Sequence, residues 1–231
     1  MAKAKIKQEY DIPLSGLSNT TVKTASVCVY DISESTTWNG ADKAILEALR
    51  VYIKTLQNDS YASQSIDFAA LAFNHDTKVT VDFTPIKDMK EVPKTKVEGG
   101  TDINKAVLDG LNMLDKRKEY YKANNIKFKA GWLYLVTDGQ SNEDIAEAAS
   151  KTNELIKKKQ LTMIVIGAGT DIDTTELNRF DDTRPVIFSP NADDLTPLFE
   201  WLSHVSIAVG KSMKGEKVTV KPLDNRFEFI G

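Results

Sequence analysis

The sequence predicts an α/β protein of the doubly wound, Rossmann-like type, with a mostly parallel central sheet, one antiparallel edge strand and helices on both faces. Three observations support this fold class. Short apolar segments alternate with longer amphipathic segments from residue 22 onward. Several short segments are apolar at nearly every position, as in strands that are buried on both faces. A shorter arm, residues 78–83, follows the turn residues Asn74, His75 and Asp76, and predicts an antiparallel hairpin at the edge of the sheet.

The first half of the chain predicts two buried strands, one long helix and the edge arm. Residues 22–30 and 66–73 are the apolar segments that predict the strands. A helix starting at Asn39 or Asp42 is predicted between them, because apolar residues recur there at helical spacing. These positions are Ile45, Leu49, Tyr52, Ile53 and Leu56. Residues 84–98 contain two prolines and several charges, and predict a loop.

The second half repeats the alternation. Thr101 is predicted to cap a helix, Ser141 or Asn142 to cap the next one, and Asp173 to begin a short helix as part of a capping box. The predicted strands are residues 131–137, 161–167 and 186–188. The predicted inner faces of the first and last helices are Ile103, Val107, Leu111 and Leu114, and, within residues 193–209, Leu195, Leu198, Leu202 and Val205.

The domain organisation follows from length and composition. A chain of 231 residues suits one domain, which we place at residues 21–210, after a leader or edge segment at 1–20. Residues 211–231 form a C-terminal extension with two alternating arms. These arms form a hairpin on the domain, pair with the N-terminal segment, or pack on another chain.

Charge and cysteine usage limit the classes of partner. The net charge is −3 with acids and bases interspersed, so neither a nucleic acid nor a membrane is expected as the main partner. No apolar run is long enough to span a bilayer, and the start of the chain lacks the core of a signal peptide. The single cysteine, Cys28, lies within an apolar run and predicts a buried thiol in a reducing compartment. We therefore expect a cytoplasmic protein.

Oxygen-bearing side chains follow three of these segments at strand-to-helix turns. Asp31, Ser33 and Ser35 end the first strand, Thr101 opens a helix, and Asp138 ends the strand at 131–137. Right-handed crossovers bring the carboxyl ends of parallel strands to one rim, so we expect the two carboxylates to lie close together. Carboxylates and hydroxyls suit a hard divalent cation, with Mg²⁺ preferred and Mn²⁺ next. Ordinary turn and cap chemistry explains each residue alone, but not easily all three segments together.

In this order and context, these residues resemble the metal-ion-dependent adhesion site of the von Willebrand factor A (vWA) family. The family signature is Asp-x-Ser-x-Ser, then a Thr, then an Asp, and the resemblance covers roughly residues 22–209. It implies the vWA fold and a module that is not an enzyme. It also implies that Mg²⁺ or Mn²⁺, held by the carboxylates directly or through water, bridges to a Glu or Asp of a partner protein. The implied metal ligands are Asp31, Ser33, Ser35, Thr101 and Asp138.

Two turns and the closing helix carry a narrower resemblance. Residues 99–101, 137–139 and 199–203 are similar to the small stand-alone bacterial and phage vWA proteins, including the tellurium-resistance-associated type. This resemblance implies an intracellular complex, in which the partner is an AAA+ ATPase, a kinase or a phosphatase of the same operon. The sequence itself selects none of these three.

The chain departs from the usual family pattern beside the first motif. Glu34 stands where many members have Gly, and Thr36 where many have Met. Glu34 and Trp38 are expected to border the contact with the partner. The alternative for Glu34 is a solvated surface residue, and the alternative for Trp38 is packing over the first helix.

Two other functions stay open at this point. Asp31 loosely resembles the nucleophile of Mg²⁺-dependent, phosphatase-like hydrolases, although their second acid corresponds to Ser33 here and no matching lysine follows. The second open function is a scaffold that holds a complex together through its helices or tail, without metal. His75 and His204 have no visible nucleophile or metal partner, so a histidine-based hydrolase is not expected.

Overall fold

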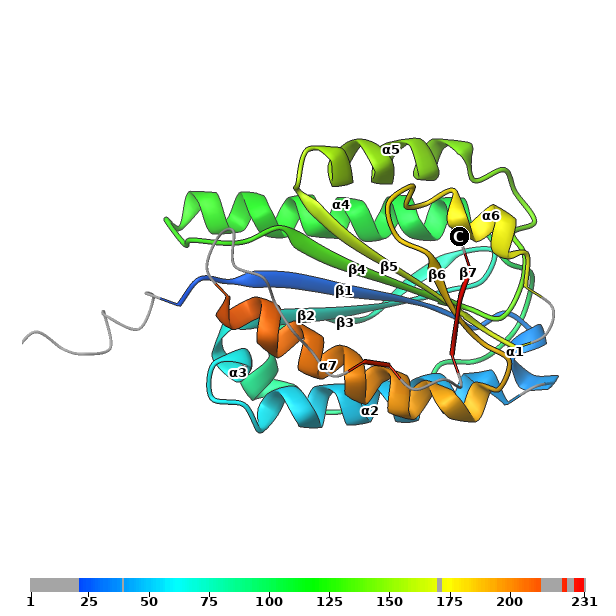
Figure 1. Ribbon diagram of the computed structural model, residues 1–231, viewed down its shortest axis with the longest axis horizontal. Helices are drawn as coiled ribbons and strands as arrows, with labels where there is room; N and C mark the ends of the chain where they lie inside the picture. The colour runs from blue at the N-terminus through cyan, green and yellow to red at the C-terminus, as the bar shows by residue number, and fades with distance from the viewer. Residues whose placement is uncertain (1–20, 39, 170–171, 213–221, 224–226, 231) are drawn as a thin grey trace, which may run out of the picture.

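A seven-stranded sheet in the order β3-β2-β1-β4-β5-β6-β7 forms the centre of the molecule (Figure 1). The computed structural model describes residues 21–38, 40–169, 172–212, 222–223 and 227–230. The strands are β1 (Thr24–Asp31), β2 (Ile66–Phe73), β3 (Thr77–Pro85), β4 (Gly131–Thr137), β5 (Leu161–Ala168), β6 (Val186–Ser189) and β7 (Glu228–Ile230). The helices are α1 (Ser35–Trp38), α2 (Ala41–Gln57), α3 (Ala62–Ser65), α4 (Ile103–Ala123), α5 (Ala146–Lys157), α6 (Thr174–Asn178) and α7 (Leu195–Lys211), with 3₁₀ turns η3 (Ile86–Asp88) and η4 (Ala192–Asp194).

The five inner strands are parallel, and the predicted fold class is confirmed. β3 pairs antiparallel with β2, as the hairpin signal predicted. A second antiparallel edge comes from β7, which pairs with β6 through Ile230 opposite Val186. The C-terminal extension therefore contributes a strand to the sheet of its own chain, whereas a hairpin between its two arms stays a prediction. The parts of its first arm at 218–221 and of the leader at 1–20 lie outside the described residues.

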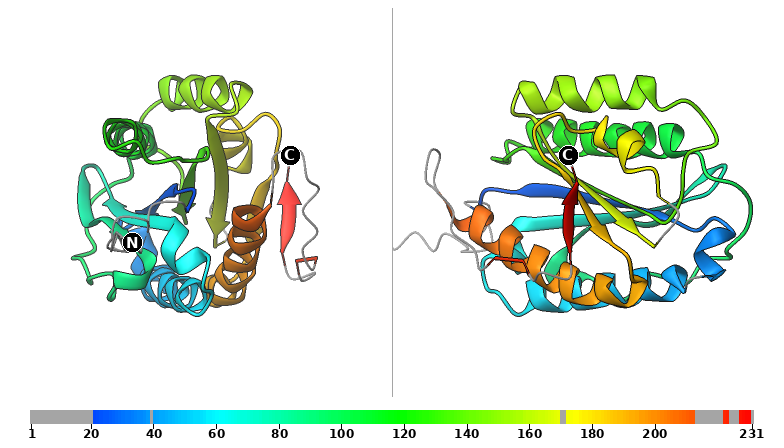
Figure 2. Two further views of the ribbon diagram at one scale, coloured as in Figure 1. Left: turned by 90° about the vertical axis from the view of Figure 1, so that its left-hand side faces the viewer. Right: turned by 45° about the vertical axis from the view of Figure 1, so that its right-hand side comes forward.

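Helices cover both faces of the sheet, and the alternation of side chains along β1 shows why. Cys28 and Tyr30 face α2 and α7, whereas Val27 and Val29 face α4 and α5. All four are fully or almost fully buried, because successive strand residues point to opposite faces and both faces are covered. Figure 2 shows the two helical layers with the twisted sheet between them. In the described part of the chain, no helix is sufficiently long and apolar to cross a membrane.

Several predicted helix starts are wrong by a few residues, and the hydrogen bonds explain the differences. Asp102, not Thr101, caps α4, because its carboxylate accepts a hydrogen bond from the Lys105 backbone N–H at 2.8 Å. Neither Ser141 nor Asn142 caps α5, which begins only at Ala146. Asp173 does cap α6. The short helix α1 was not predicted, and α7 begins at Leu195 after the turn η4.

Two buried polar clusters stabilise the end of the sheet at which the parallel strands begin. Asp67 accepts hydrogen bonds from Arg117 at 2.5 Å, Tyr121 at 2.7 Å and Lys23 at 3.1 Å. Burial opposes the ionisation of Asp67, but these donors outweigh it and lower its pKa below the usual value. The Asp67 cluster lies at the opposite end of the sheet from the rim residues, because Asp67 pairs with Ala25 at the start of β1, whereas Asp31 is the last residue of β1.

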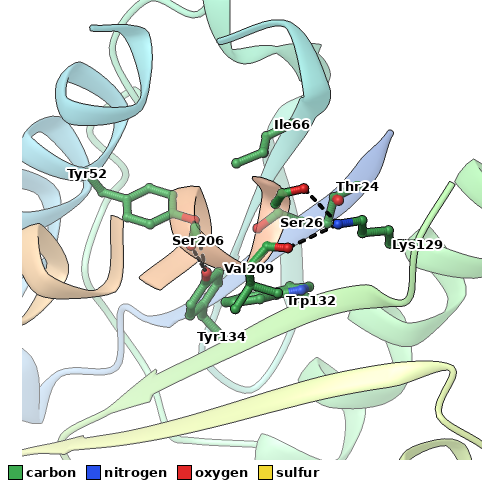
Figure 3. Close-up of a pocket in the computed structure, with 10 residues that line it drawn as sticks. Thr24, Ser26, Tyr52, Ile66, Lys129, Trp132, Tyr134, Ser206 and Val209 are labelled. Carbon is green, nitrogen blue, oxygen red and sulfur yellow. Dashed lines mark hydrogen bonds between the residues drawn. The ribbon is translucent and has the colours of Figure 1, made fainter. Parts of the chain in front are cut away.

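The second cluster ties α7 to the sheet. The hydroxyls of Tyr52, Tyr134 and Ser206 lie within 2.9–3.1 Å of one another (Figure 3). The ammonium group of Lys129 donates to three carbonyl oxygens at the end of α7, those of residues 209, 210 and 212, at 2.7–3.0 Å. A lysine at this position satisfies carbonyls that have no partner within the helix.

Candidate metal centre at the carboxyl ends of the strands

Asp31 is the buried centre of the candidate site. It is the last residue of β1 and is fully buried. The Ser33 backbone N–H donates to its Oδ1 at 2.7 Å, and the Thr137 hydroxyl donates to its Oδ2 at 2.6 Å. One carboxylate oxygen is thus held by the loop that follows β1, and the other by the end of the neighbouring strand β4.

Ser33 and Ser35 connect this carboxylate to the second one. Their hydroxyl oxygens lie 3.0 Å apart, and the Ser35 hydroxyl donates to Asp138 Oδ1 at 3.0 Å. The parallel register explains the meeting, because Tyr30 lies opposite Val136 and the two chains leave the sheet side by side. A chain of hydrogen bonds therefore joins Asp31, Ser33, Ser35 and Asp138 at one rim. Their role as metal ligands stays a prediction.

Thr101 belongs to the same rim through its backbone. Its N–H donates to Asn142 Oδ1 at 2.6 Å, and its carbonyl accepts from the Asn142 N–H at 2.7 Å. Two residues earlier, the Gly99 carbonyl accepts a hydrogen bond from the Glu34 N–H at 3.1 Å. The turn that carries Thr101 is therefore bonded both to the loop of the two serines and to the loop of Asp138.

Burial is the largest influence on the electrostatics of Asp31. Burial raises its pKa to about 6, although hydrogen bonds from Ser33 and Thr137 act against the rise, and the nearby charge of Asp138 adds to it. Among the described residues, no lysine or arginine forms an ion pair with Asp31. A cation bound between the two carboxylates would remove this penalty.

The donor set fits a hard divalent cation. It consists of carboxylate and hydroxyl oxygens only, on a framework held by the hydrogen bonds above, which is the chemistry that Mg²⁺ and Mn²⁺ prefer. The described residues contain no group of three or more His, Cys, Asp or Glu side chains arranged to hold a metal. A site here would therefore need hydroxyl oxygens besides the two carboxylates, and the hydroxyls of Ser33, Ser35 and Thr101 are the candidates from the sequence.

The remaining candidates lie around the site with different outcomes. Glu34 is exposed, and Trp38 is the last residue of α1, but the Trp38 side chain lies outside the described part of the structure. His75 is exposed and its ring lies against Gly99, which has a positive φ of 81°. His204 is exposed on α7.

Thr137 and Asn142 are site residues that the sequence analysis missed. Thr137 is the last residue of an apolar strand, and a hydroxyl at that position was a usable signal. Asn142 was interpreted as a helix cap because Asn is a common cap residue. Instead, Asn142 bonds to the segment that carries Thr101. Ser141 does the same, because its hydroxyl oxygen accepts a hydrogen bond from the Ile103 N–H at 3.2 Å.

Comparison with known proteins agrees with this geometry. The family model of the von Willebrand factor type A domain matches residues 27–201. A comparison of the sequence with curated proteins found no significant match.

Solved structures share the fold at low sequence identity. The von Willebrand factor type A structure from Catenulispora acidiphila matches with a TM-score of 0.62 and 20% identity, covering 81% of this chain and 43% of that one. Proximal thread matrix protein 1 from the mussel byssus is described with zinc in its MIDAS motif, the metal-ion-dependent adhesion site. It matches with a TM-score of 0.56 and 19% identity, covering 80% of this chain and 48% of that one.

The manganese-loaded TRAP protein of Plasmodium vivax matches with a TM-score of 0.53 and 16% identity, covering 78% of this chain and 74% of that one. The chain thus spans less than half of the first two matched chains and about three quarters of the third. At these identities the matches show the fold alone.

Proposed function

Because this chain belongs to the von Willebrand factor type A domain family, we propose that it is a metal-dependent protein-binding module, in which a divalent cation at the rim bridges to a Glu or Asp of a partner protein. The observation that carries the proposal is the hydrogen-bonded chain from Asp31 through Ser33 and Ser35 to Asp138. It gathers candidate oxygen ligands of two segments at one end of the sheet, and the backbone bonds between Thr101 and Asn142 attach the third segment.

The residues have separate roles in this proposal. Asp31 and Asp138 supply the negative charge, directly or through water. Ser33, Ser35 and Thr101 supply neutral oxygens, which leave the charge of the ion incompletely balanced if one carboxylate acts through water. When bound, Mg²⁺ or Mn²⁺ supplies positive charge and an open coordination position for the carboxylate of a partner.

Two structures that share the fold are described with a bound divalent cation, which supports a cation as the cofactor proposed here. The mussel protein is described with zinc in its MIDAS motif, and the Plasmodium protein is described as loaded with manganese. Zinc usually prefers nitrogen and sulfur ligands, whereas the donors here are all oxygen. We therefore propose Mg²⁺ or Mn²⁺ for this chain.

The geometry favours binding over nucleophilic catalysis. A phosphatase-like nucleophile must reach its substrate, whereas Asp31 is fully buried and both its oxygens accept hydrogen bonds. Ser33, at the position of the second acid, bonds to Ser35 instead. A turnover of aryl phosphate that is lost in Asp31→Asn would reverse this preference.

The biological setting is part of the proposal. Burial raises the pKa of the Cys28 thiol well above its usual value, and an inert, buried thiol is compatible with a reducing compartment such as the cytoplasm. Glu34, exposed beside the two serines, is proposed to border the partner, and the position of Trp38 at the end of α1 suggests the same role. The tellurium-resistance-like setting, with an AAA+ ATPase, kinase or phosphatase as the partner, rests on the sequence resemblance alone.

The test is capture of a partner by immobilised protein with and without chelator. We expect proteins bound in Mg²⁺ to be released by EDTA and not to be captured by Asp138→Asn. Asp181→Asn is the matched control, because Asp181 is also buried and accepts from a backbone N–H and a threonine hydroxyl, at 2.8 and 2.6 Å, away from the rim. Partners that remain bound in EDTA would leave only a metal-independent scaffold.

A further inference from the structure

The turn that carries Thr101 is held by hydrogen bonds along its whole length. The Glu98 N–H donates to the Ile32 carbonyl at 3.1 Å, and the Asp102 N–H donates to the Asn74 carbonyl at 2.8 Å. Between these two bonds, the Gly99 carbonyl is bonded to the Glu34 N–H. Backbone groups in a solvent-exposed loop could bond to water instead, so this degree of fixation points to a role for the position of the turn.

Asn142 makes the shortest and most direct of these contacts. It is the residue that bonds to both backbone groups of Thr101, through its side-chain oxygen at 2.6 Å and its own N–H at 2.7 Å. It also lies four residues after Asp138. One residue therefore sets the position of the threonine relative to the loop of the second carboxylate.

Gly100 provides an independent sign that this contact is tightly fitted. A Cβ atom on Gly100 would lie 2.6 Å from Asn142 Oδ1, which is closer than such atoms can approach. The φ of Gly100 is not in the left-handed region, so the space beside Asn142 accounts for the glycine better than the backbone conformation does.

We infer that Asn142 is a positioning residue for the Thr101 ligand, and that Gly100 lacks a side chain so that the Asn142 oxygen can reach the Thr101 N–H. This inference rests on the proposed metal site. Residues that orient metal ligands without touching the metal commonly affect affinity by about 10–100-fold when they are changed. Asn142 fixes the backbone of Thr101. It thereby determines the position at which the Thr101 hydroxyl is presented.

The experiment measures Mn²⁺ affinity by calorimetry and amide hydrogen exchange in metal-free protein. Asn142→Ala is expected to weaken Mn²⁺ binding by about 10–100-fold and to speed exchange of the Thr101 N–H. Asn142→Asp keeps an acceptor oxygen and is expected to restore the slow exchange. Gly100→Ala is expected to resemble Asn142→Ala, and the double variant to lose little more than either single one.

Asn153→Ala is the matched control. The Asn153 Oδ1 also accepts a backbone N–H, that of Asp182 at 2.9 Å, but it lies on α5 away from the rim. This control is expected to leave Mn²⁺ affinity and Thr101 exchange unchanged. Unchanged affinity and exchange in Asn142→Ala would overturn the inference. Wild-type protein that binds no Mn²⁺ would overturn the proposed function, while the exchange measurement would still report whether Asn142 holds the turn.

Discussion

Replacing Asp67 by Asn should destabilise the domain strongly while leaving its candidate metal site intact. Asp67 has 1% of its side chain exposed and is bonded to Arg117, Tyr121 and Lys23. Removing one member of a buried ion pair typically costs about 3–5 kcal/mol. We expect the lower end, about 3 kcal/mol, because the Arg117 guanidinium also lies over the rings of Phe83, Tyr120 and Tyr121.

This loss can be measured by urea denaturation followed by circular dichroism. For a domain of this size, a change of about 3 kcal/mol corresponds to a melting temperature lower by about 6–12 °C. The control is Asp115→Asn, which breaks the 3.4 Å pair between Lys118 and a half-exposed carboxylate on the same helix. That change should cost less than about 1 kcal/mol.

The pH dependence gives a second test of the same cluster. A carboxylate whose pKa is lower in the folded state stabilises the fold above its unfolded pKa of about 4, and this contribution is lost as the pH falls through the folded value. Wild-type protein should therefore lose more stability below about pH 4 than Asp67→Asn does. Equal acid sensitivity, or a cost within 1 kcal/mol at neutral pH, would refute the reasoning.

Three further predictions concern packing, the last helix and the site. Gly110→Ala should lower the free energy of unfolding by about 1–3 kcal/mol, since the new Cβ would lie 2.8 Å from Val29 Cγ2 and 3.1 Å from Leu133 Cδ1. An unchanged melting temperature would show that these side chains can move aside. Lys129→Met should speed amide exchange in the last turn of α7, because three carbonyl oxygens lose their donor; unaltered exchange there would mean that water replaces it. Thr101→Ala should weaken a captured partner to the same extent as EDTA without changing the far-ultraviolet circular dichroism, and a partner retained by this variant would remove Thr101 from the ligand set.

The five parallel strands were predictable because each is a mostly apolar run that the two helical layers bury. β2 and β4 have the predicted bounds, β1 and β3 differ by one or two residues at both ends, and β5 is one residue longer than predicted. The strand β7 could not be placed from sequence, since an alternating three-residue arm fits an edge of this sheet, another segment or another chain equally well. Its pairing with β6 is a tertiary contact that no local pattern encodes.

The meeting of the candidate residues at one rim was predictable, but the groups that support them were not. Asp31, Ser33, Ser35 and Asp138 meet because parallel strands end at one rim, which follows from topology alone. Asn142 was interpreted as a helix cap, because the same side-chain oxygen that can cap a helix can also bond to a distant backbone N–H. Only the tertiary structure shows that the Asn142 oxygen accepts a hydrogen bond from the Thr101 N–H, and that α5 begins later.

The central claim is that one oxygen-only cation site is built from three segments of the chain. It is tested most directly by calorimetric titration of Mg²⁺ and Mn²⁺ into wild-type protein, Ser35→Ala, Asp138→Asn and the control Asp181→Asn. The account predicts one ion per chain for wild type and the control, and weak or absent binding for Ser35→Ala and Asp138→Asn, all with unchanged circular dichroism. Equal affinity in all four proteins, or no binding by wild type, would contradict it.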